Sequence, residues 1–245
     1  METCWVVDCG EIGYEESLEL QKQLLQLRNK DVIPDILLLL EHPPTITLGA
    51  KATEDMLRIP RRVLEQRGIG VFDINRGGKA TYHGPGQVVG YAIRAIDLHQ
   101  LNAHLTGLED TMLNVVNSYG IKGIKSYEVD EKHRRLPGVW HILNNKEYKL
   151  GSIGIEIKNG ITTHGFALNI NTNLNHFDFI DMCGFKDRGA TSMQKLLQRP
   201  IHLNEIKQKL AQSFADIFKY KIEKKSYLSL KDAMNKFYSS SSSSL

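Results

Sequence analysis

Residues Gly138–Asn171 read GVWHILNNKEYKLGSIGIEIKNGITTHGFALNIN, and this stretch decides how the chain folds. It contains three runs rich in β-branched and aromatic residues, Gly138–Leu143, Lys149–Lys158 and Thr162–Asn171. Asn144-Asn145 separates the first two runs and Asn159-Gly160 the last two, and such pairs favour the positive φ angles of tight hairpin turns. The pattern therefore predicts an antiparallel meander of three strands.

A glycine-rich stretch precedes this meander. Arg76–Gln87 reads RGGKATYHGPGQ and is followed by the apolar run VVGYAI. Four glycines and a proline in twelve residues exclude a helix interior or a central strand, so we expect a shaped loop. Glycine lets main-chain N–H groups approach a ligand, and the arginine, threonine, tyrosine and histidine of the loop can fix a carbonyl or an anion.

Hydrophobic periodicity around these two stretches predicts one α/β domain over residues 1–237. Thr106 with Glu109 is a potential capping box, and Asn204 is placed to cap the last helix. The serine tract at residues 238–245 is expected to be a disordered tail. The predicted strands are Cys4–Val7, Ile36–Glu41, Thr45–Leu48, Val71–Ile74 and Val88–Arg94, and the predicted helices are Tyr14–Asn29, Pro60–Arg67, Leu105–Tyr119 and Glu205–Phe218.

The composition excludes several classes of protein. A net charge of +3, from 31 basic and 28 acidic residues, is too balanced for a dedicated nucleic-acid binder. The longest apolar run, Ile36–Leu40, is too short to cross a membrane. Three cysteines without CxxC spacing suggest neither a disulfide framework nor a thiolate zinc site, which indicates a reducing compartment. The first residues lack the basic region of a presequence, so we expect a cytoplasmic protein. We also expect it to use no metal and no cofactor.

Arginines gather around the predicted helix at residues 60–67. A solvated helix face explains them, and so does a docking face for an acidic carrier protein; the sequence leaves both interpretations open. The residues are Arg58, Arg61, Arg62 and Arg67. A second charged run, Asp130–Arg135, is expected in a solvent-exposed loop.

Cys183 is the cysteine whose surroundings suit chemistry, because it lies in an irregular, polar segment beside Gly184. A cysteine nucleophile needs a group that stabilises the thiolate and moves protons. His83, His164, His176 and Lys149 can each serve, and sequence spacing does not choose among them.

Several segments together resemble the lipoyl(octanoyl) transferases. These segments are PDILLLLEHPPTITLG, RGGKATYHGPGQVVGY, the meander quoted above, Cys183-Gly184 and Ala190-Thr191-Ser192. They occur in the order and spacing of that family from about Ile33 to Met193. The resemblance implies transfer of an octanoyl group from octanoyl-acyl carrier protein to a lysine on lipoyl domains of 2-oxoacid dehydrogenase E2 subunits or glycine cleavage H protein, the first step of endogenous lipoate biosynthesis. It also implies a monomer with mixed, largely antiparallel sheets flanked by helices, as in the biotin and lipoate protein ligases.

The resemblance also implies roles for individual residues. Cys183 matches the family's nucleophile and Lys149 its lysine partner, while Met182 stands where the family commonly has proline. The expected substrate-contacting residues form three stretches: Arg76, Gly77, Gly78, Lys79, Ala80, Thr81, Tyr82 and His83; Ser152, Ile153 and Gly154; and Gly165, Phe166 and Ala167.

The mechanism that follows as a hypothesis needs neither ATP nor a metal. The ammonium of Lys149 stabilises the Cys183 thiolate, which attacks the octanoyl thioester, and Lys149 gives its proton to the departing thiol. Neutral Lys149 then accepts a proton from the incoming lysine. Backbone N–H groups near Gly77, Gly78 or Gly184 are oxyanion-hole candidates, and His83 is expected to orient the loop or the substrate.

Three other functions compete with this one. An ATP-using lipoate ligase has a similar fold and activates the free acid, so it does not need Cys183. An amidotransferase moves octanoyl between two lipoyl-bearing proteins with the same kind of cysteine and lysine pair. A non-catalytic module that docks carrier protein or lipoyl domain uses neither residue.

Overall fold

The predicted meander forms three strands of an eight-stranded sheet in the computed structural model, which describes residues 1–126, 136–181 and 189–242. Strands β8 (Gly138–Leu143), β9 (Lys146–Lys158) and β10 (Ile161–Asn169) pair antiparallel. The turn residues Asn144, Asn145 and Asn159 have φ angles of 50°, 58° and 53°. The asparagine turns therefore act as the sequence indicated.

The other strands complete a mixed sheet in the order β11-β1-β2-β6-β10-β9-β8-β7. Strand β1 runs parallel to both of its neighbours, β2 and β11, and every other pair is antiparallel. The prediction of a mixed, largely antiparallel sheet is confirmed. The bounds are β1 (Glu2–Glu11), β2 (Asp35–Glu41), β6 (Gln87–Ile93), β7 (Gly123–Lys125) and β11 (Tyr220–Ser226).

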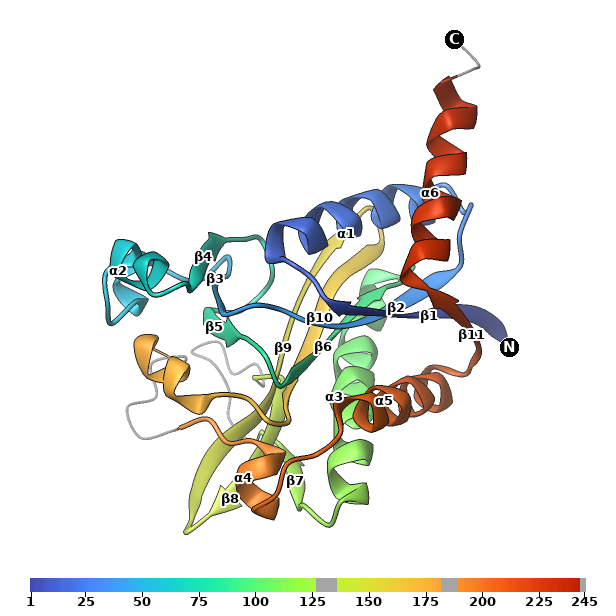
Figure 1. Cartoon of the computed structure of the whole chain (residues 1–245). Coiled ribbons are helices and arrows are strands. Elements are labelled where there is room, and N and C mark those ends of the chain that lie inside the picture. The colour runs from blue at the N-terminus through green and yellow to red at the C-terminus, as the bar shows by residue number, and fades with distance from the viewer. Residues whose placement is uncertain (127–135, 182–188, 243–245) are drawn as a thin grey trace.

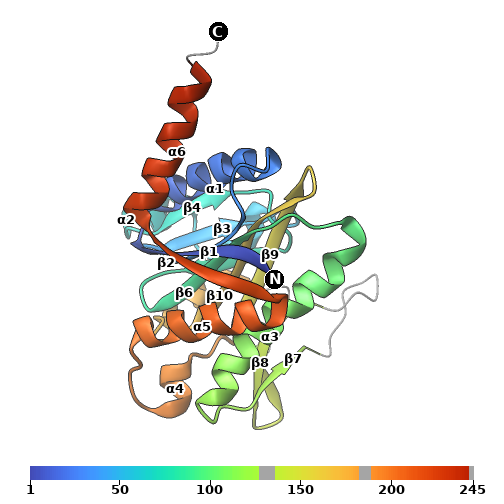
Figure 2. The ribbon, with the colours of Figure 1, turned by 90° about the vertical axis from the view of Figure 1, so that its right-hand side faces the viewer.

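Helices cover both faces of this sheet (Figures 1 and 2). Helices α3 (Leu101–Ser118) and α5 (Leu203–Phe218) pack on one face, where Met112, Phe166 and Phe214 belong to one buried cluster. Helices α1 (Tyr14–Asn29) and α6 (Tyr227–Ser242) pack on the other face, over a second cluster that includes Leu24, Leu38 and Tyr91. We call these the α3 face and the α1 face.

A three-stranded sheet lies beside the α1 face and carries the glycine-rich loop. Its order is β4 (Gly70–Asp73), β3 (Thr45–Leu48) and β5 (Ala80–His83), so part of the stretch expected to be loop is a strand. Helix α2 (Arg61–Gln66) and the short helices η1 (Glu54–Met56) and η3 (Leu174–Phe179) surround it. Two further short helices, η2 (Leu98–Gln100) and α4 (Met193–Leu197), precede α3 and α5.

Both predicted helix caps are wrong. Helix α3 begins at Leu101, so Thr106 lies inside it, and the capping box is formed by Asp97 and Gln100 of η2. Helix α5 begins at Leu203 with His202 as its N-cap, so Asn204 is already helical. In each case the helical backbone begins two to four residues before the predicted start, at Leu101 and at Leu203.

Two elements follow the helix that was expected to end the ordered chain. The lysine-rich strand β11 pairs with β1, and α6 packs Leu230 and Met234 into the α1-face cluster. Helical backbone continues to Ser242, where the sequence suggested disorder from residue 238. Residues 243–245 and Asp130–Arg135 lie outside the described residues.

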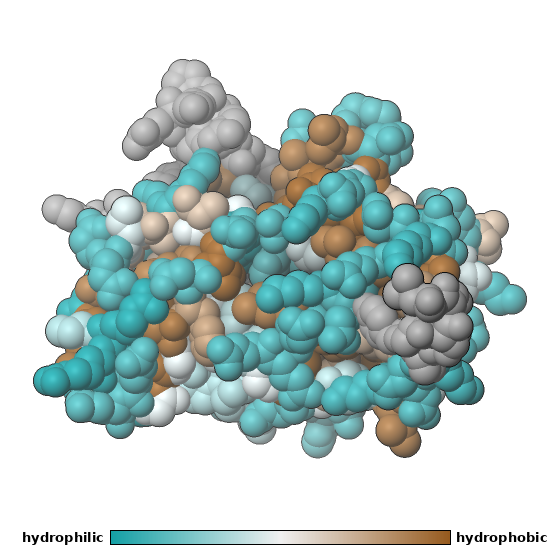
Figure 3. Space-filling model, turned by 90° about the horizontal axis from the view of Figure 1, so that it is seen from above, coloured by the Kyte–Doolittle hydropathy of each residue, from teal (hydrophilic) through white to brown (hydrophobic). Residues whose placement is uncertain are grey.

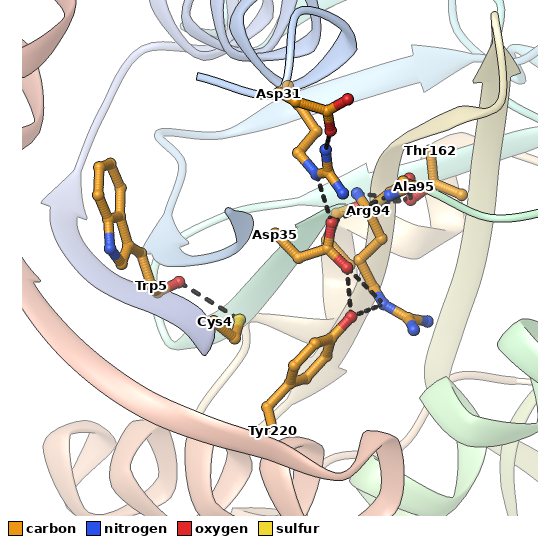
Figure 4. A network of polar contacts seen from close by, with 10 residues as sticks. Cys4, Trp5, Asp31, Asp35, Arg94, Ala95, Thr162 and Tyr220 are labelled. Atoms are coloured by element: carbon orange, nitrogen blue, oxygen red, sulfur yellow. Dashed lines mark hydrogen bonds and ion pairs between the residues drawn. The ribbon is translucent and has the colours of Figure 1, made fainter. Parts of the chain in front are cut away.

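A buried ion-pair network joins elements at the β11 side of the large sheet (Figure 4). The carboxylate of Asp35, at the start of β2, accepts hydrogen bonds from Arg28 Nε at 2.7 Å, the backbone N–H of Ala95 at 3.0 Å and the hydroxyl of Tyr220. Arg94 Nε lies 3.6 Å from the same carboxylate. One buried anion thus ties together β2, the end of β6, α1 and β11.

Hydrophilic side chains cover most of the face that carries α1 and α6, with hydrophobic ones interspersed (Figure 3). In the described part of the chain, no helix is both long and apolar enough to span a bilayer.

Candidate active site

Arg76 anchors the glycine-rich loop to the small sheet. Its side chain is 7% exposed, and Nη2 donates to the backbone carbonyl of Thr47 at 2.9 Å and to the Thr47 hydroxyl at 2.6 Å. Its Nη1 donates to the carbonyl of Gly77 at 3.0 Å. The guanidinium therefore holds the shape of the loop, a role that the sequence alone did not indicate.

Glycines allow the loop to lie directly against strand β9. The N–H of Gly77 donates to Ile155 O at 2.9 Å, and a Cβ on Gly154 would lie 2.8 Å from Gly77 O and 2.9 Å from Arg76 Cδ. Gly78 has a φ of +91°, which favours glycine. Because the Gly77 N–H is already bonded, this amide is not an oxyanion-hole donor in this structure.

Strand β5 directs its side chains alternately to two sides. Ala80 and Tyr82 pack into the cluster beneath the small sheet. A hydrogen bond of 2.8 Å joins the Tyr82 hydroxyl to His176 Nδ1. Burial raises the pKa of Tyr82 to about 12. Thr81 and His83 alternate with them, as strand geometry requires, while Lys79, just before the strand, is half-buried.

His83 belongs to a buried group of aromatic rings on the α1 face. Its ring is stacked on Tyr14 with centroids 6.1 Å apart and meets the ring of His42 at 5.8 Å. Burial, followed by the nearby His42, holds the pKa of His83 well below its ordinary value. His83 is therefore a neutral imidazole at pH 7.

His42 and His164 are held in the same group through Tyr91. His42 Nδ1 donates to Ile12 O at 2.8 Å, so its Nε2 accepts from the Tyr91 hydroxyl at 2.8 Å. His164 has a φ of +58° and its ring meets that of Tyr91 at 6.0 Å. Burial lowers the pKa of both histidines to about 4. Both rings are therefore neutral and held by packing within this group.

The two other predicted substrate-contacting stretches lie side by side on neighbouring strands. Ser152 pairs with Ala167 and Gly154 with Gly165. Ile153 and Phe166 alternate with these residues, and both pack in the α3-face cluster. The side chains of Ile153 and Phe166 therefore point away from the glycine-rich loop, and only their backbones lie beside it.

Lys149 lies near the start of β9, and backbone hydrogen bonds join it to the segment that follows the predicted nucleophile. Its N–H donates to Gly189 O and its carbonyl accepts from Thr191 N–H, both at 2.9 Å. Its Nζ lies 5.0 Å from the centre of the Trp140 ring. Cys183, Met182 and Gly184 lie outside the described residues, but the segment that begins six residues after Cys183, at Gly189, is hydrogen bonded to Lys149.

The remaining sequence candidates have other partners. Burial raises the pKa of Cys4 and of Cys9 to about 12, so these thiols are inert. Arg61 is paired with Glu54 and Asp73, whereas Arg58, Arg62 and Arg67 are exposed. Among the described residues, no group of three or more histidines, cysteines or carboxylates is arranged to hold a metal ion.

A surface cavity of about 640 Å³ opens beside the segment that brackets Lys149. Ser192 and Asn171 line it, together with the exposed cations Lys195 and Arg199. The cavity is therefore polar, with positive charge at its surface.

Comparison with known proteins identifies the family of the chain. The model of the family described as lipoyl protein ligase A/B catalytic domain matches residues 13–215. An octanoyltransferase of Desulforamulus reducens is 36% identical, covering 89% of this chain and 92% of its own length. One of Caldicellulosiruptor saccharolyticus is 41% identical, covering 84% and 85%.

Solved structures support the fold. Lipoate-protein ligase A bound with ATP superposes with a TM-score of 0.73 at 12% identity, covering 98% of this chain and 95% of its own. The bipartite lipoate protein ligase of Thermoplasma acidophilum gives 0.71 at 14% identity, covering 98% and 92%. The expected likeness to lipoate protein ligases is thereby confirmed. The chain belongs to the lipoyl protein ligase A/B catalytic-domain family.

Proposed function

We propose that this protein transfers an octanoyl group from octanoyl-acyl carrier protein to a lysine of a lipoyl domain, as a step of lipoate biosynthesis. The observation that carries the proposal is the identity of 36–41% to octanoyltransferases over 84–89% of the chain. The convergence of the glycine-rich loop and the Gly189–Thr191 segment on strand β9 supports it.

Lys149 is the proton carrier of the proposed reaction. Its ammonium stabilises the Cys183 thiolate, which forms a thioester with the octanoyl carbonyl while the carrier protein's thiol leaves with the Lys149 proton. The lysine of the lipoyl domain then attacks this thioester, neutral Lys149 accepts a proton from the amine, and the Cys183 thiolate leaves. Two backbone hydrogen bonds hold Lys149 to Gly189 and Thr191, so its strand cannot shift independently of the segment after Cys183.

The glycine-rich loop and the small residues opposite it form the proposed acyl-binding wall. Gly154 has no side chain between the loop and β9, which lets the loop rest on the sheet itself. The buried rings around His83 and Tyr91 exclude water from behind the loop. A dry surface of this kind suits an alkyl chain and strengthens hydrogen bonds to the thioester carbonyl.

Positive charge near the cavity beside Ser192 suits an acidic carrier protein. Lys195 and Arg199 are exposed at this cavity. In the sequence they lie closer than Arg58 or Arg62 to Gly189 and Thr191, the backbone partners of Lys149. We therefore place the donor's docking surface here in the proposal. The proposed acceptors are lipoyl domains of 2-oxoacid dehydrogenase E2 subunits and glycine cleavage H protein.

Intact-mass measurement after incubation with octanoyl-acyl carrier protein, without ATP, tests the proposal directly. The expected product is an octanoyl adduct that is lost in Cys183→Ser and that a lipoyl domain discharges. Labelling of the lipoyl domain only when free octanoate and ATP are supplied would instead identify a ligase. Discharge by one lipoyl protein of octanoyl carried on another would identify an amidotransferase.

Replacement of Lys149 tests its role separately. Lys149→Ala should remain folded, because the bonds that bracket this residue use its backbone, and should lose most of the transfer rate. Lys146→Ala, at the exposed start of the same strand, is the matched control and should keep the wild-type rate. Equal rates in the two variants would remove Lys149 from the mechanism.

A further inference from the structure

Two buried side-chain amides connect His83 to the segment that brackets Lys149. Gln87 begins β6 and Asn169 ends β10, where the two are register partners, and they are 2% and 4% exposed. Gln87 Nε2 donates to Asn169 Oδ1 at 2.9 Å, and Asn169 Nδ2 donates to Thr191 O at 3.0 Å. Each bond joins groups from distant parts of the sequence.

Backbone carbonyls fix the direction of every hydrogen bond in this series, because a carbonyl can only accept. Asn169 must turn its NH₂ to Thr191 O, which leaves Oδ1 to accept from Gln87. Gln87 Nε2 also donates to Tyr82 O at 3.1 Å, so Gln87 Oε1 must face His83 Nδ1 at 2.7 Å. His83 therefore carries its proton on Nδ1, and Nε2 holds a lone pair.

At its other end, this series of hydrogen bonds reaches Lys149 through Thr191. Thr191 O accepts from Asn169, and Thr191 N–H donates to Lys149 O at 2.9 Å. The amides thus link the glycine-rich loop, the centre of the large sheet and the proposed proton carrier. Burying two side-chain amides costs free energy unless their polar atoms are hydrogen bonded. Here their hydrogen bonds go to His83, Tyr82 O, Thr191 O and each other.

We propose that Gln87 and Asn169 are positioning residues of the transfer site, an inference that rests on the proposed function. They keep His83 in the Nδ1–H tautomer, with Nε2 as a hydrogen-bond acceptor, and they hold the Gly189–Thr191 segment against Lys149. Neither residue touches the reacting atoms in this role.

Amide-to-acid variants change the bonds with little change in shape. Asn169→Asp keeps the acceptor for Gln87 and loses the donor to Thr191 O. Gln87→Glu loses both donors and sets a carboxylate against His83 Nδ1, which favours the imidazolium. Asn114→Asp is the control, because Asn114 Nδ2 donates to Ser213 Oγ at 3.1 Å between α3 and α5, outside the proposed site.

Single-turnover octanoyl transfer should fall at least about tenfold in Gln87→Glu and Asn169→Asp, because displaced catalytic groups lose rate steeply. The Asn114→Asp control should stay within about twofold of the wild type, and urea unfolding should show that Asn169→Asp is still folded under the assay conditions. A pH profile that gains a new titration in Gln87→Glu alone would further support the link to His83. A rate in Asn169→Asp no lower than in the control would overturn the proposal.

Nitrogen-15 NMR of histidine-labelled protein tests the tautomer without any activity, with His83→Gln used to identify the signal. The expected wild-type signature is Nδ1–H, which should change in Gln87→Glu and persist in Asn114→Asp. An Nε2–H signature in the wild type would refute the network. A wild type that transfers no octanoyl group would contradict the proposed function, while the tautomer would still report on the hydrogen bonds themselves.

Discussion

Replacing Gly154 by alanine should dislodge the glycine-rich loop from strand β9. The new Cβ would lie 2.8 Å from Gly77 O and 2.9 Å from Arg76 Cδ. Carbon atoms prefer separations of about 3.5–4.0 Å, so the loop must retreat by roughly 0.6–1.1 Å. Neither neighbour can yield easily, because the first is backbone and the second belongs to a side chain bonded to Thr47.

The free energy of unfolding should fall by about 1–2 kcal/mol in Gly154→Ala. Overpacking costs about 1–3 kcal/mol, and the lower backbone entropy of unfolded alanine returns about 0.4–1 kcal/mol. For a chain of this size each kcal/mol corresponds to a fall of about 2–4 °C in Tm. Because the loop is part of the proposed site, transfer should slow by roughly a hundredfold for a shift near 1 Å.

Gly13→Ala is the control for the same substitution in open space. A Cβ on Gly13 meets no atom within 4 Å, and the φ of −59° is accessible to alanine. The small loss at this helix N-cap and the entropic gain should nearly cancel, leaving a change within about 0.5 kcal/mol. Urea unfolding and single-turnover transfer compare the two variants. If Gly154→Ala behaves like Gly13→Ala in both assays, the close approach of loop and strand does not position the site.

Two further predictions concern stability. His42, whose folded pKa is about 4, binds its proton first in the unfolded chain, so unfolding free energy should fall as pH drops from about 6.5 towards 4. The loss should reach about 3 kcal/mol from this group, and urea unfolding of His42→Gln should show a shallower pH slope. Asp35→Asn should cost about 3–5 kcal/mol, because it leaves Arg94 as a buried cation without its anion. Asp31→Asn, which removes an exposed partner of Arg28, should cost less than about 1 kcal/mol, and equal losses would contradict the importance of burial.

Sequence periodicity predicted the elements whose signal is local. The meander combines strand-forming runs with asparagine turns, and α1 was predicted with the bounds that the structure shows. Strand β11 was missed because Tyr220–Ser226 reads as a lysine-rich surface run and becomes a strand only by pairing with β1. The helix α6 was missed because it runs directly into the serine tract, although Leu230 and Met234 are buried.

In the candidate site too, some residues have a local sequence signal and others do not. The glycine-rich loop could be predicted from its composition, whereas Lys149 and the small residues of β9 and β10 were singled out by the family resemblance, and their roles stay predictions. Thr47 and Asn169 carry no such signal, since their importance lies in what a distant segment presents to them. Likewise, the period of two along a strand could separate Ile153 from Ser152, but only the packing against α3 identifies which face of the sheet is the core.

These contacts suggest why the glycine-rich loop needs both its glycines and its polar residues. The glycines permit backbone to lie on backbone, which leaves N–H and carbonyl groups close to a dry surface where each must be bonded. Arg76 meets that need at one end of the loop by bonding to Thr47, and Gln87 meets it at the other by bonding to Tyr82 O and Asn169. His83 lies between them. Its ring is neutral because it is buried, and its orientation is fixed because Gln87 Oε1 accepts a hydrogen bond from its Nδ1–H. The residues that stabilise the loop are therefore the same ones that fix the chemistry of its histidine, so a variant that relaxes the loop should disturb the site even where the fold survives.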